Sequence, residues 1–361
     1  MLKEKIKILV TDDSLVTRKF LVNMLSTDPD IEVIGTANDG AEAIAFIRKR
    51  KPDVITMDIN MPVMDGFEAT LNIMRELPIP IVIVSSAFSN TDATKKFKAL
   101  EAGAVGILPL PVGLGHPDYE KSMKHFVSYM KTMSEVKLIR RWSHTPGSIR
   151  KDVNTQLQIS TPPAPKVEPS HIINLIAIGA SAGGPMVVKE ILEKLPENLT
   201  VPIIIVQHIE SEFTQGYVDW LNLTSKIKVL IAKDGESMEP GKAYMAPGDY
   251  HIGVKSANTL RISKEAPDNG LRPSVAFLFR SVLNVYHHKS ICILLSGMGV
   301  DGAKELKMLR DAGSITIAQN AETALIHGMP GEAIKLGGAS HIMSPSQIIN
   351  FIQKRVSTIS K

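Results

Sequence analysis

Residues 172–185 read IINLIAIGASAGGP, an apolar run that ends in a glycine-rich turn followed by a proline. The run over 172–178 predicts a strand buried on both faces, because its residues are nearly all apolar rather than alternating with polar ones. Pro185 suits the first turn of a helix, so residues 179–184 predict the passage from a strand into a helix. This strand, turn and helix set the fold class of the second half of the chain.

Similar apolar runs recur along the chain. Three lie downstream, at residues 201–206, 227–231 and 291–295. Five shorter ones, at residues 6–10, 31–34, 53–57, 81–84 and 105–108, alternate with amphipathic helical stretches in the first part. Because alternating strands and helices form parallel sheets covered on both faces, we predict an α/β protein with two doubly wound parallel-sheet domains.

A proline-rich segment separates these two patterns. Between Ser134 and Ser170 the apolar periodicity disappears, and five prolines occur among Ser, Thr and Gln residues. Such a composition is typical of a linker, and a length of 361 residues suits two domains. We therefore predict a first domain over residues 1–133, a linker over 134–170 and a second domain over 171–361.

Charge and composition exclude several classes of protein. The formal net charge is +4, and residues 134–170 hold six basic against three acidic residues, so the two domains are near balance. Nothing in them forms the basic stripe of a nucleic-acid-binding protein. No apolar run approaches the ~18–20 residues that span a bilayer, and the run after MLKEKIK is too short for a signal peptide. The single cysteine, Cys292, excludes an intramolecular disulfide. We expect a cytoplasmic protein without nucleic-acid binding or membrane insertion.

Three carboxylates follow predicted strands of the first domain. Asp12 and Asp13 end the first apolar run, and Asp58 ends the third. The carboxyl ends of parallel strands meet at one edge of a sheet, so these groups would crowd there. A divalent cation would offset their repulsion, and carboxylate oxygens suit Mg²⁺. The sequence predicts an Mg²⁺ site, with separate solvated carboxylates as the alternative.

Asp12-Asp13-Ser14, residues 58–66 (DINMPVMDG) and Ser85 together resemble the response-regulator receiver family over about residues 1–130. The resemblance implies a flavodoxin-like fold. It also implies that Asp58 accepts a phosphoryl group from a histidine kinase, that Asp12 and Asp13 hold Mg²⁺, and that the Ser85 hydroxyl contacts the phosphoryl oxygen.

One position departs from that family. Leu110-Pro111 stands where receivers carry a Lys-Pro pair. The missing charge-assisted hydrogen bond is worth about 1.5–3 kcal/mol. We therefore expect Asp58 to be phosphorylatable but with an altered response.

Three strand ends of the second domain carry a serine, a histidine and an aspartate. Ser181 lies in a G-x-S-x-G turn, where free N–H groups of a helix N-terminus can bind an oxyanion. His208 directly follows the strand at 201–206, and Asp301 follows the strand at 291–295 through a glycine turn. Such a set supplies a nucleophile, a base and an acid that orients the base. His251 is the second candidate base, and a dinucleotide-binding loop would need glycine where Ser181 stands.

Six segments of the second domain resemble, in order, the motifs of the chemotaxis protein-glutamate methylesterases, the CheB family, across about residues 171–355. They are residues 179–185, 206–208, 244–251, 272–275, 297–303 and 328–330. The resemblance implies a Rossmann-like catalytic domain in which Ser181 is the nucleophile, His208 the general base and Asp301 its orienting acid. With a receiver in front, the architecture resembles that family throughout.

The resemblance also implies the reaction. Ser181 attacks a glutamyl methyl ester on the cytoplasmic helices of a chemoreceptor, methanol leaves, and water hydrolyses the acyl-enzyme without a cofactor. The same attack on glutamine gives deamidation. We expect the backbone N–H groups of Ala182 and Met298 to bind the oxyanion. In the family, the unphosphorylated receiver covers the active site.

Three further positions depart from the family's usual residues. Ala182 replaces threonine, Glu210 replaces proline and Ala276 replaces aspartate. As the alternative function, we keep a response regulator with a degenerate receiver and a non-catalytic or nucleotide-binding α/β output domain. A DNA-binding output is disfavoured, because residues 171–361 are far too long for a simple helix-turn-helix.

Overall fold

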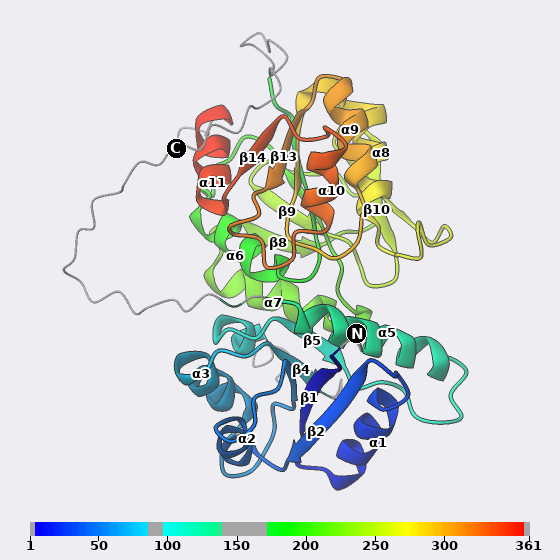
Figure 1. Ribbon diagram of the computed structural model, residues 1–361. Helices are drawn as coiled ribbons and strands as arrows, with labels where there is room; N and C mark the ends of the chain where they lie inside the picture. The colour runs from blue at the N-terminus through cyan, green and yellow to red at the C-terminus, as the bar shows by residue number, and fades with distance from the viewer. Residues whose placement is uncertain (1–3, 86–96, 137, 139–171, 357–361) are drawn as a thin grey trace, which may run out of the picture.

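The computed structural model describes residues 4–85, 97–136, 138 and 172–356, which fold into two α/β units (Figure 1). Most of the predicted linker at 134–170 lies outside the described residues, so the domain boundaries stay a prediction. In the described part, no helix combines the length and the apolar character needed to cross a bilayer.

The first unit is a five-stranded parallel sheet in the order β2-β1-β3-β4-β5. Its strands are β1 (Ile6–Thr11), β2 (Ile31–Ala37), β3 (Val54–Met57), β4 (Ile81–Ser85) and β5 (Gly106–Pro109). Its helices are α1 (Leu15–Leu25), α2 (Gly40–Ile47), α3 (Gly66–Glu76) and α5 (Tyr119–Ser134), with a further helical turn at residues 97–101. The doubly wound parallel fold predicted for this unit is confirmed.

Polar residues start the helices directly behind the strand ends. The side chains of Ser14, Asp39 and Asp65 accept hydrogen bonds from backbone N–H groups in the first turns of α1, α2 and α3. Such caps satisfy N–H groups that would otherwise lack partners. A methyl group added at Gly66 would lie 2.0 Å from the Asp58 carbonyl oxygen, so glycine allows α3 to begin against that loop. The short connections hold the acidic residues at the carboxyl edge of the sheet.

The second unit is a seven-stranded parallel sheet in the order β14-β13-β12-β6-β7-β9-β8. Its strands are β6 (Leu175–Ala180), β7 (Ile203–Gln207), β8 (Lys228–Ile231), β9 (Lys242–Met245), β12 (Ser290–Leu294), β13 (Ile315–Gln319) and β14 (His341–Met343). A separate antiparallel hairpin joins β10 (His251–Ser256) to β11 (Thr259–Ser263). The parallel sheet confirms the predicted fold class here as well.

Helices cover both faces of this sheet. They are α6 (Gly184–Lys194), α7 (Thr214–Thr224), α8 (Val275–Tyr286), α9 (Ala303–Asp311), α10 (Met329–Lys335) and α11 (Pro345–Arg355), with 3₁₀ turns η1 (Ser211–Phe213) and η2 (His287–Lys289). Helix α6 contacts α7 and α11 on one face, and α9 contacts α8 and α10 on the other. Fully buried strand residues pack beneath each set.

The strand order reverses at the centre of this sheet. From β6 the chain builds β7, β8 and β9 on one side, then returns to build β12, β13 and β14 on the other. Ligands of open α/β sheets bind at the carboxyl ends of the strands where the order reverses. Here that place is the edge formed by β12, β6 and β7.

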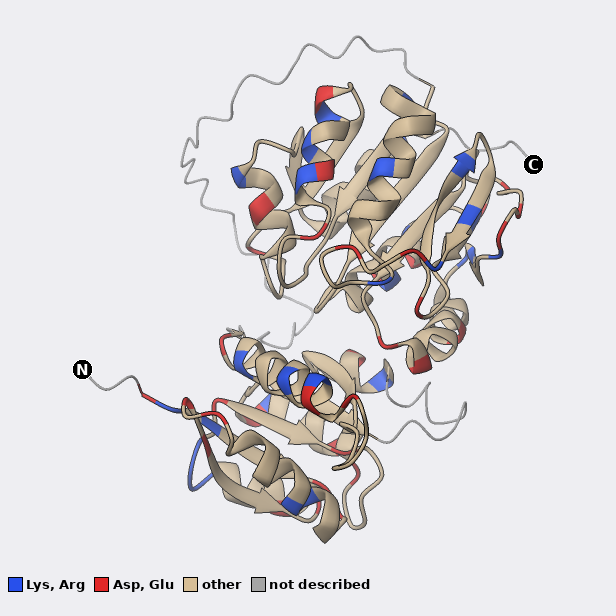
Figure 2. Cartoon of the chain, turned by 90° about the vertical axis from the view of Figure 1, so that its right-hand side faces the viewer, with Lys and Arg blue, Asp and Glu red and all other residues tan. Residues whose placement is uncertain are grey.

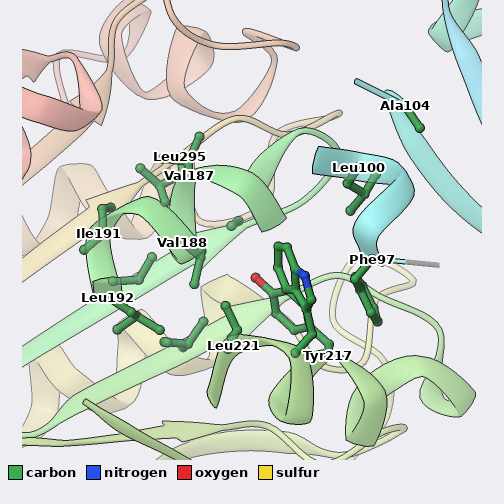
Figure 3. Close-up of a cluster of buried hydrophobic side chains, with 14 of the residues drawn as sticks. Phe97, Leu100, Ala104, Val187, Val188, Ile191, Leu192, Tyr217, Leu221 and Leu295 are labelled. Atoms are coloured by element: carbon green, nitrogen blue, oxygen red, sulfur yellow. The ribbon is translucent and has the colours of Figure 1, made fainter. Parts of the chain in front are cut away.

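The two units meet through helices of both. Figure 1 shows α5 and β5 of the first unit facing α7 of the second, and the perpendicular view in Figure 2 shows α5 turned toward the second unit. A buried apolar cluster runs across this boundary from Phe97 and Leu100 to Val187 and Tyr217 (Figure 3). Figure 2 also shows Lys and Arg interspersed with Asp and Glu on both units.

Candidate active site

The three predicted catalytic side chains follow three neighbouring strands. Ser181 comes directly after β6, His208 directly after β7, and Asp301 lies seven residues beyond the end of β12. Because β12, β6 and β7 are hydrogen-bonded neighbours, all three residues lie at one edge of the sheet. That edge is the place where the strand order reverses.

The turn that carries Ser181 is fixed by the loop after β12. The Ser181 N–H donates to the Ser296 carbonyl oxygen at 3.0 Å, and the Ser296 hydroxyl donates to the Ala182 carbonyl oxygen at 2.8 Å. A methyl group added at Gly297 would lie 2.8 Å from Ser181 Cβ and 2.3 Å from Met329 Sδ. Glycine is therefore required at position 297 for the loop to pass this close to Ser181.

His208 and Asp301 form a buried pair. His208 Nε2 lies 3.0 Å from Asp301 Oδ2, and the exposed fractions of the two side chains are 12% and 2%. A carboxylate only accepts, so His208 donates from Nε2 and its Nδ1 is left free to accept a proton. This leaves Nδ1 as the nitrogen available for Ser181.

The start of α8 holds the Asp301 carboxylate. Oδ1 accepts hydrogen bonds from the Ser274 hydroxyl at 2.9 Å and the Ala276 N–H at 3.1 Å, and Oδ2 accepts one from the Val275 N–H at 2.7 Å. Burial by itself would raise the pKa of Asp301, but the bond from His208, its charge and the α8 N–H donors outweigh burial and lower that pKa. The carboxylate therefore stays ionised in the neutral range.

Ser181 is near this pair but not bonded to it. Among the hydrogen bonds of the described residues, none joins Ser181 Oγ to His208. Catalytic hydrogen bonds are often long without substrate and tighten when it binds. Ala182 and Met298 lie in the two turns beside Ser181, and Met298 is 40% exposed. Their role as oxyanion donors stays a prediction.

His251, the second candidate base, lies elsewhere. It begins β10 in the antiparallel hairpin, is 0% exposed, stacks on Phe277 and bonds through Nε2 to the Ala266 carbonyl oxygen at 3.2 Å. A side chain enclosed in this way cannot reach a substrate. His208 therefore remains the candidate base.

The sequence interpretation missed the side chains that support this site. Ser274 binds Asp301, Ser296 binds the turn that carries Ser181, and Gln207 binds the main chain of that turn. Ser274 and Gln207 belong to the segments that carry the family resemblance, and Ser296 opens the glycine turn. The available signals were a polar residue at or just after an apolar strand, for Gln207 and Ser296, and a serine just before a helix, for Ser274.

The acidic residues of the first unit lie at the carboxyl edge of its own sheet. Burial, reinforced by the charges of Asp58 and Asp13, raises the pKa of Asp12 to about 6. Burial also raises the pKa of Asp58, with Asp13 adding to the effect, while N–H donors and the Ser85 hydroxyl oppose it. The three carboxylates therefore influence one another, although within the described ranges no three acidic, His or Cys side chains form a ready metal site.

The departures from family residues have identifiable surroundings. Leu110 packs against the apolar cluster of the first unit, and its N–H donates to the Ser85 carbonyl oxygen at 3.2 Å. Glu210 lies 3.6 Å from His125 on α5. Ala276 is buried and uses its N–H on Asp301. Nothing in the structure explains why position 182 lacks a hydroxyl.

Two family models match this chain. The model described as CheB methylesterase matches residues 176–352, and the model described as response regulator receiver domain matches residues 8–116. Among solved structures, the Thermotoga maritima CheB methylesterase catalytic domain is 35% identical, with a TM-score of 0.48 over 50% of this chain and 97% of that one. The response regulator domain of Thermotoga maritima CheB is 34% identical, with a TM-score of 0.34 over 37% and 100%.

Curated relatives match almost the whole length. Protein-glutamate methylesterase/protein-glutamine glutaminase 1 of Syntrophus aciditrophicus is 44% identical over 98% of this chain and 99% of its own. Protein-glutamate methylesterase/protein-glutamine glutaminase 4 of Geobacter metallireducens is 46% identical over 95% and 97%. The chain therefore belongs to the CheB family of protein-glutamate methylesterases and protein-glutamine glutaminases, in which a receiver is joined to a methylesterase domain.

Proposed function

We propose that this enzyme hydrolyses glutamyl methyl esters, and deamidates glutamines, on the cytoplasmic helices of a chemoreceptor, with Ser181, His208 and Asp301 as its catalytic residues. It acts in the cytoplasm, and a chemotaxis histidine kinase supplies its phosphoryl group. The observation that carries the catalytic assignment is the His208–Asp301 pair, 3.0 Å apart, at the sheet edge that also bears Ser181. The measurement that tests the function is methanol release from a methylated receptor fragment, with ammonia release from a glutamine-bearing fragment beside it.

The reaction proceeds in two halves. Nδ1 of His208 takes the Ser181 proton while Oγ attacks the ester carbonyl, and His208 then passes that proton to the departing methoxide. Asp301 stabilises the imidazolium that forms between these steps. In the second half, His208 takes a proton from a water molecule as it attacks the acyl carbonyl, and passes that proton to the departing Ser181 Oγ, which leaves a free glutamate. The N–H groups of Ala182 and Met298 bind the oxyanion in both halves.

The receiver restrains this reaction by lying over the active site. On α5, Thr132 contacts Met298, with Oγ1 and Sδ 3.4 Å apart, and His125 lies 3.6 Å from Glu210 just beyond the base. Ala182, next to the nucleophile, packs against the receiver's apolar cluster. A receptor helix needs the same surface, so α5 and the substrate exclude each other.

A second contact fastens the receiver in this position. Phe97 is 1% exposed and its ring lies 5.2 Å from Tyr217 and 5.3 Å from Trp220 (Figure 3). Beside it, Lys189 of α6 lies 3.5 Å from Glu101. The aromatic contact is the stronger of the two, because the full burial of a Phe contributes about 1.5–3 kcal/mol, whereas the Glu101 side chain of the ion pair is still 38% exposed and such pairs contribute about 1 kcal/mol or less.

Phe97→Ala is expected to raise the esterase activity of the unphosphorylated enzyme by about fivefold or more. The lost burial favours separation of the two units, and each 1.4 kcal/mol changes their open-to-closed ratio about tenfold. Methanol release measured without phosphodonor checks this. The control is Phe46→Ala. Phe46 is an aromatic residue of α2 that packs on Gly35 of β2, within the receiver. Equal basal activity in Phe97→Ala and wild type would contradict the fastening role.

Phosphorylation of Asp58 relieves this restraint. Burial raises the pKa values of Asp12 and Asp58, with a smaller contribution from repulsion between the neighbouring carboxylates, while hydrogen bonding from the Ser85 hydroxyl lowers that of Asp58. Carboxylate oxygens that repel one another in this way suit Mg²⁺, and Asp12, Asp13 and Asp58 would hold the ion. When bound, Mg²⁺ offsets negative charge during phosphoryl transfer. Asp58 supplies the accepting oxygen, and Ser85 binds the phosphoryl group once it is attached.

Incubation with Mg²⁺ and a small phosphodonor is expected to add one phosphoryl group to the wild type and none to Asp58→Asn, as read by intact mass.

Leu110→Lys is expected to enlarge the rise in esterase activity that accompanies phosphorylation, by up to about tenfold, because it restores a charge-assisted hydrogen bond. Leu110→Met is the matched control and keeps the wild-type response. An unmodified wild-type mass would contradict the role of Asp58, and an unchanged response in Leu110→Lys would contradict that of position 110.

A further inference from the structure

We propose that Gln207 is a positioning residue, which fixes the nucleophile and the base relative to each other through one buried carboxamide. Gln207 is the last residue of β7 and is 2% exposed. Its Nε2 donates to the Ser181 carbonyl oxygen at 2.9 Å and to the His208 carbonyl oxygen at 3.1 Å. One side chain thus binds the main chain of both catalytic residues.

The two acceptors belong to different strand ends. Ser181 follows β6 and His208 follows β7, and these strands pair in register with Ala180 opposite Gln207. Beyond that last pair, the His208 N–H donates to the Ala180 carbonyl oxygen at 2.9 Å. Past this point the strands separate into turns, and the Gln207 carboxamide continues the connection where the ladder ends. Rotation of either turn would move Ser181 Oγ relative to His208 Nδ1.

The other end of the carboxamide is left without a partner. Gln207 Oε1 is buried, and no hydrogen bond to it occurs among the described residues. Turning the amide over would set Oε1 against two carbonyl oxygens, so the two donor bonds fix its orientation. A buried polar atom without a partner opposes folding, and such atoms are uncommon in native structures. A methionine of similar length would fill the space without this penalty, so the donor end is what the site requires.

The neighbouring backbone also accommodates Gln207. A methyl group added at Gly184 would lie 2.7 Å from Oε1 and 2.7 Å from Ala180 Cβ. The start of α6 therefore approaches the carboxamide closely, and the Gly184 N–H donates to the same Ser181 carbonyl oxygen at 2.8 Å. That oxygen thus accepts from both α6 and β7, which fixes the peptide that follows the nucleophile.

The test compares two variants of the full-length enzyme that each lose a carboxamide. Gln207→Met removes both donor bonds at nearly constant volume. Asn222→Leu is the control, since Asn222 Nδ2 also donates to two main-chain carbonyls, those of Val218 at 3.0 Å and Val229 at 2.9 Å, away from the active site, while its Oδ1 accepts from the Val229 N–H at 2.9 Å. We expect Gln207→Met to lower kcat for methanol release about 10- to 100-fold with KM within about twofold, because small misplacements of reacting groups have effects of this size. Asn222→Leu is expected to change neither constant.

A second readout keeps the test independent of the receptor substrate on which the proposed function rests. A small fluorophosphonate bonds its phosphorus to Ser181 Oγ with loss of fluoride, and its rate should fall in Gln207→Met in parallel with kcat. Gln207→Glu, which keeps the length but turns oxygen toward both carbonyls, should show the same loss. Wild-type kcat per folded molecule in both Gln207 variants, even with a lowered Tm, would overturn the proposal. Undiminished activity in Ser181→Ala would instead overturn the catalytic assignment, so the two failures are distinguishable.

Discussion

Ser181→Ala is expected to lower the rate of methanol release about 10⁴-fold or more, with the fold unchanged. Alanine has no oxygen to form the acyl-enzyme, while the main-chain bonds of the turn, including the 3.0 Å bond from the residue 181 N–H to the Ser296 carbonyl, are kept. Loss of the nucleophile removes the covalent route entirely and leaves only what the oxyanion donors provide. The measurement is methanol release from a methylated receptor fragment, with thermal unfolding to verify the fold.

The control for this variant is Ser225→Ala. Ser225 follows α7 and its hydroxyl bonds to the Leu192 and Ile227 carbonyl oxygens, away from the carboxyl edge of the sheet. Its loss is expected to affect Tm but not turnover. Deamidation should follow the same pattern, because both reactions need Ser181 Oγ. Activity in Ser181→Ala equal to that of wild type would refute the assignment of the nucleophile.

The fold was predictable where buried strands have long apolar runs. The runs at 172–178, 201–206 and 291–295 became β6, β7 and β12, the three strands that carry the site. The apolar run ITIAQ of β13 was missed, and the hairpin of β10 and β11 and the short strands β9 and β14 were not predicted. The sequences KAYM in β9 and HIM in β14 are too short to give a periodic signal. They form because neighbouring strands offer hydrogen-bond partners, and the tertiary fold decides which strands are neighbours.

The positions of the candidate catalytic residues were predictable for a related reason, and those of the side chains that support them were not. Ser181 and His208 come directly after strands, so their place on the sheet follows from the strand pattern alone. The hydrogen bond from Ser274 to Asp301 joins residues that are 27 positions apart, at the start of α8. The hydrogen bond from Gln207 to Ser181 crosses from β7 to the turn after β6. Such contacts depend on the packing of helix against sheet and on strand order, neither of which a local pattern specifies.

Asp301→Asn is expected to lower kcat about 10³- to 10⁴-fold, although asparagine has nearly the same shape. Four donors converge on this carboxylate: the Ser274 hydroxyl, the N–H groups of Val275 and Ala276, and His208 Nε2. An amide has one oxygen, so one pair of these donors must face an NH₂ group. The buried mismatch should also lower the free energy of unfolding by about 1–3 kcal/mol.

The position of that NH₂ group determines how catalysis fails. If it takes the place of Oδ2, His208 must accept at Nε2, its proton moves to Nδ1, and Nδ1 can no longer take the Ser181 proton. If it takes the place of Oδ1, Ser274 and the Ala276 N–H lose their acceptor, and the start of α8 moves away from the pair. Both routes lower kcat more than they change KM. The control is Asp234→Asn, since Asp234 accepts a hydrogen bond from the Ile262 N–H in the hairpin, and it should leave both constants unchanged. Turnover of Asp301→Asn within tenfold of wild type would mean that the ionised carboxylate is not what sets the His208 tautomer.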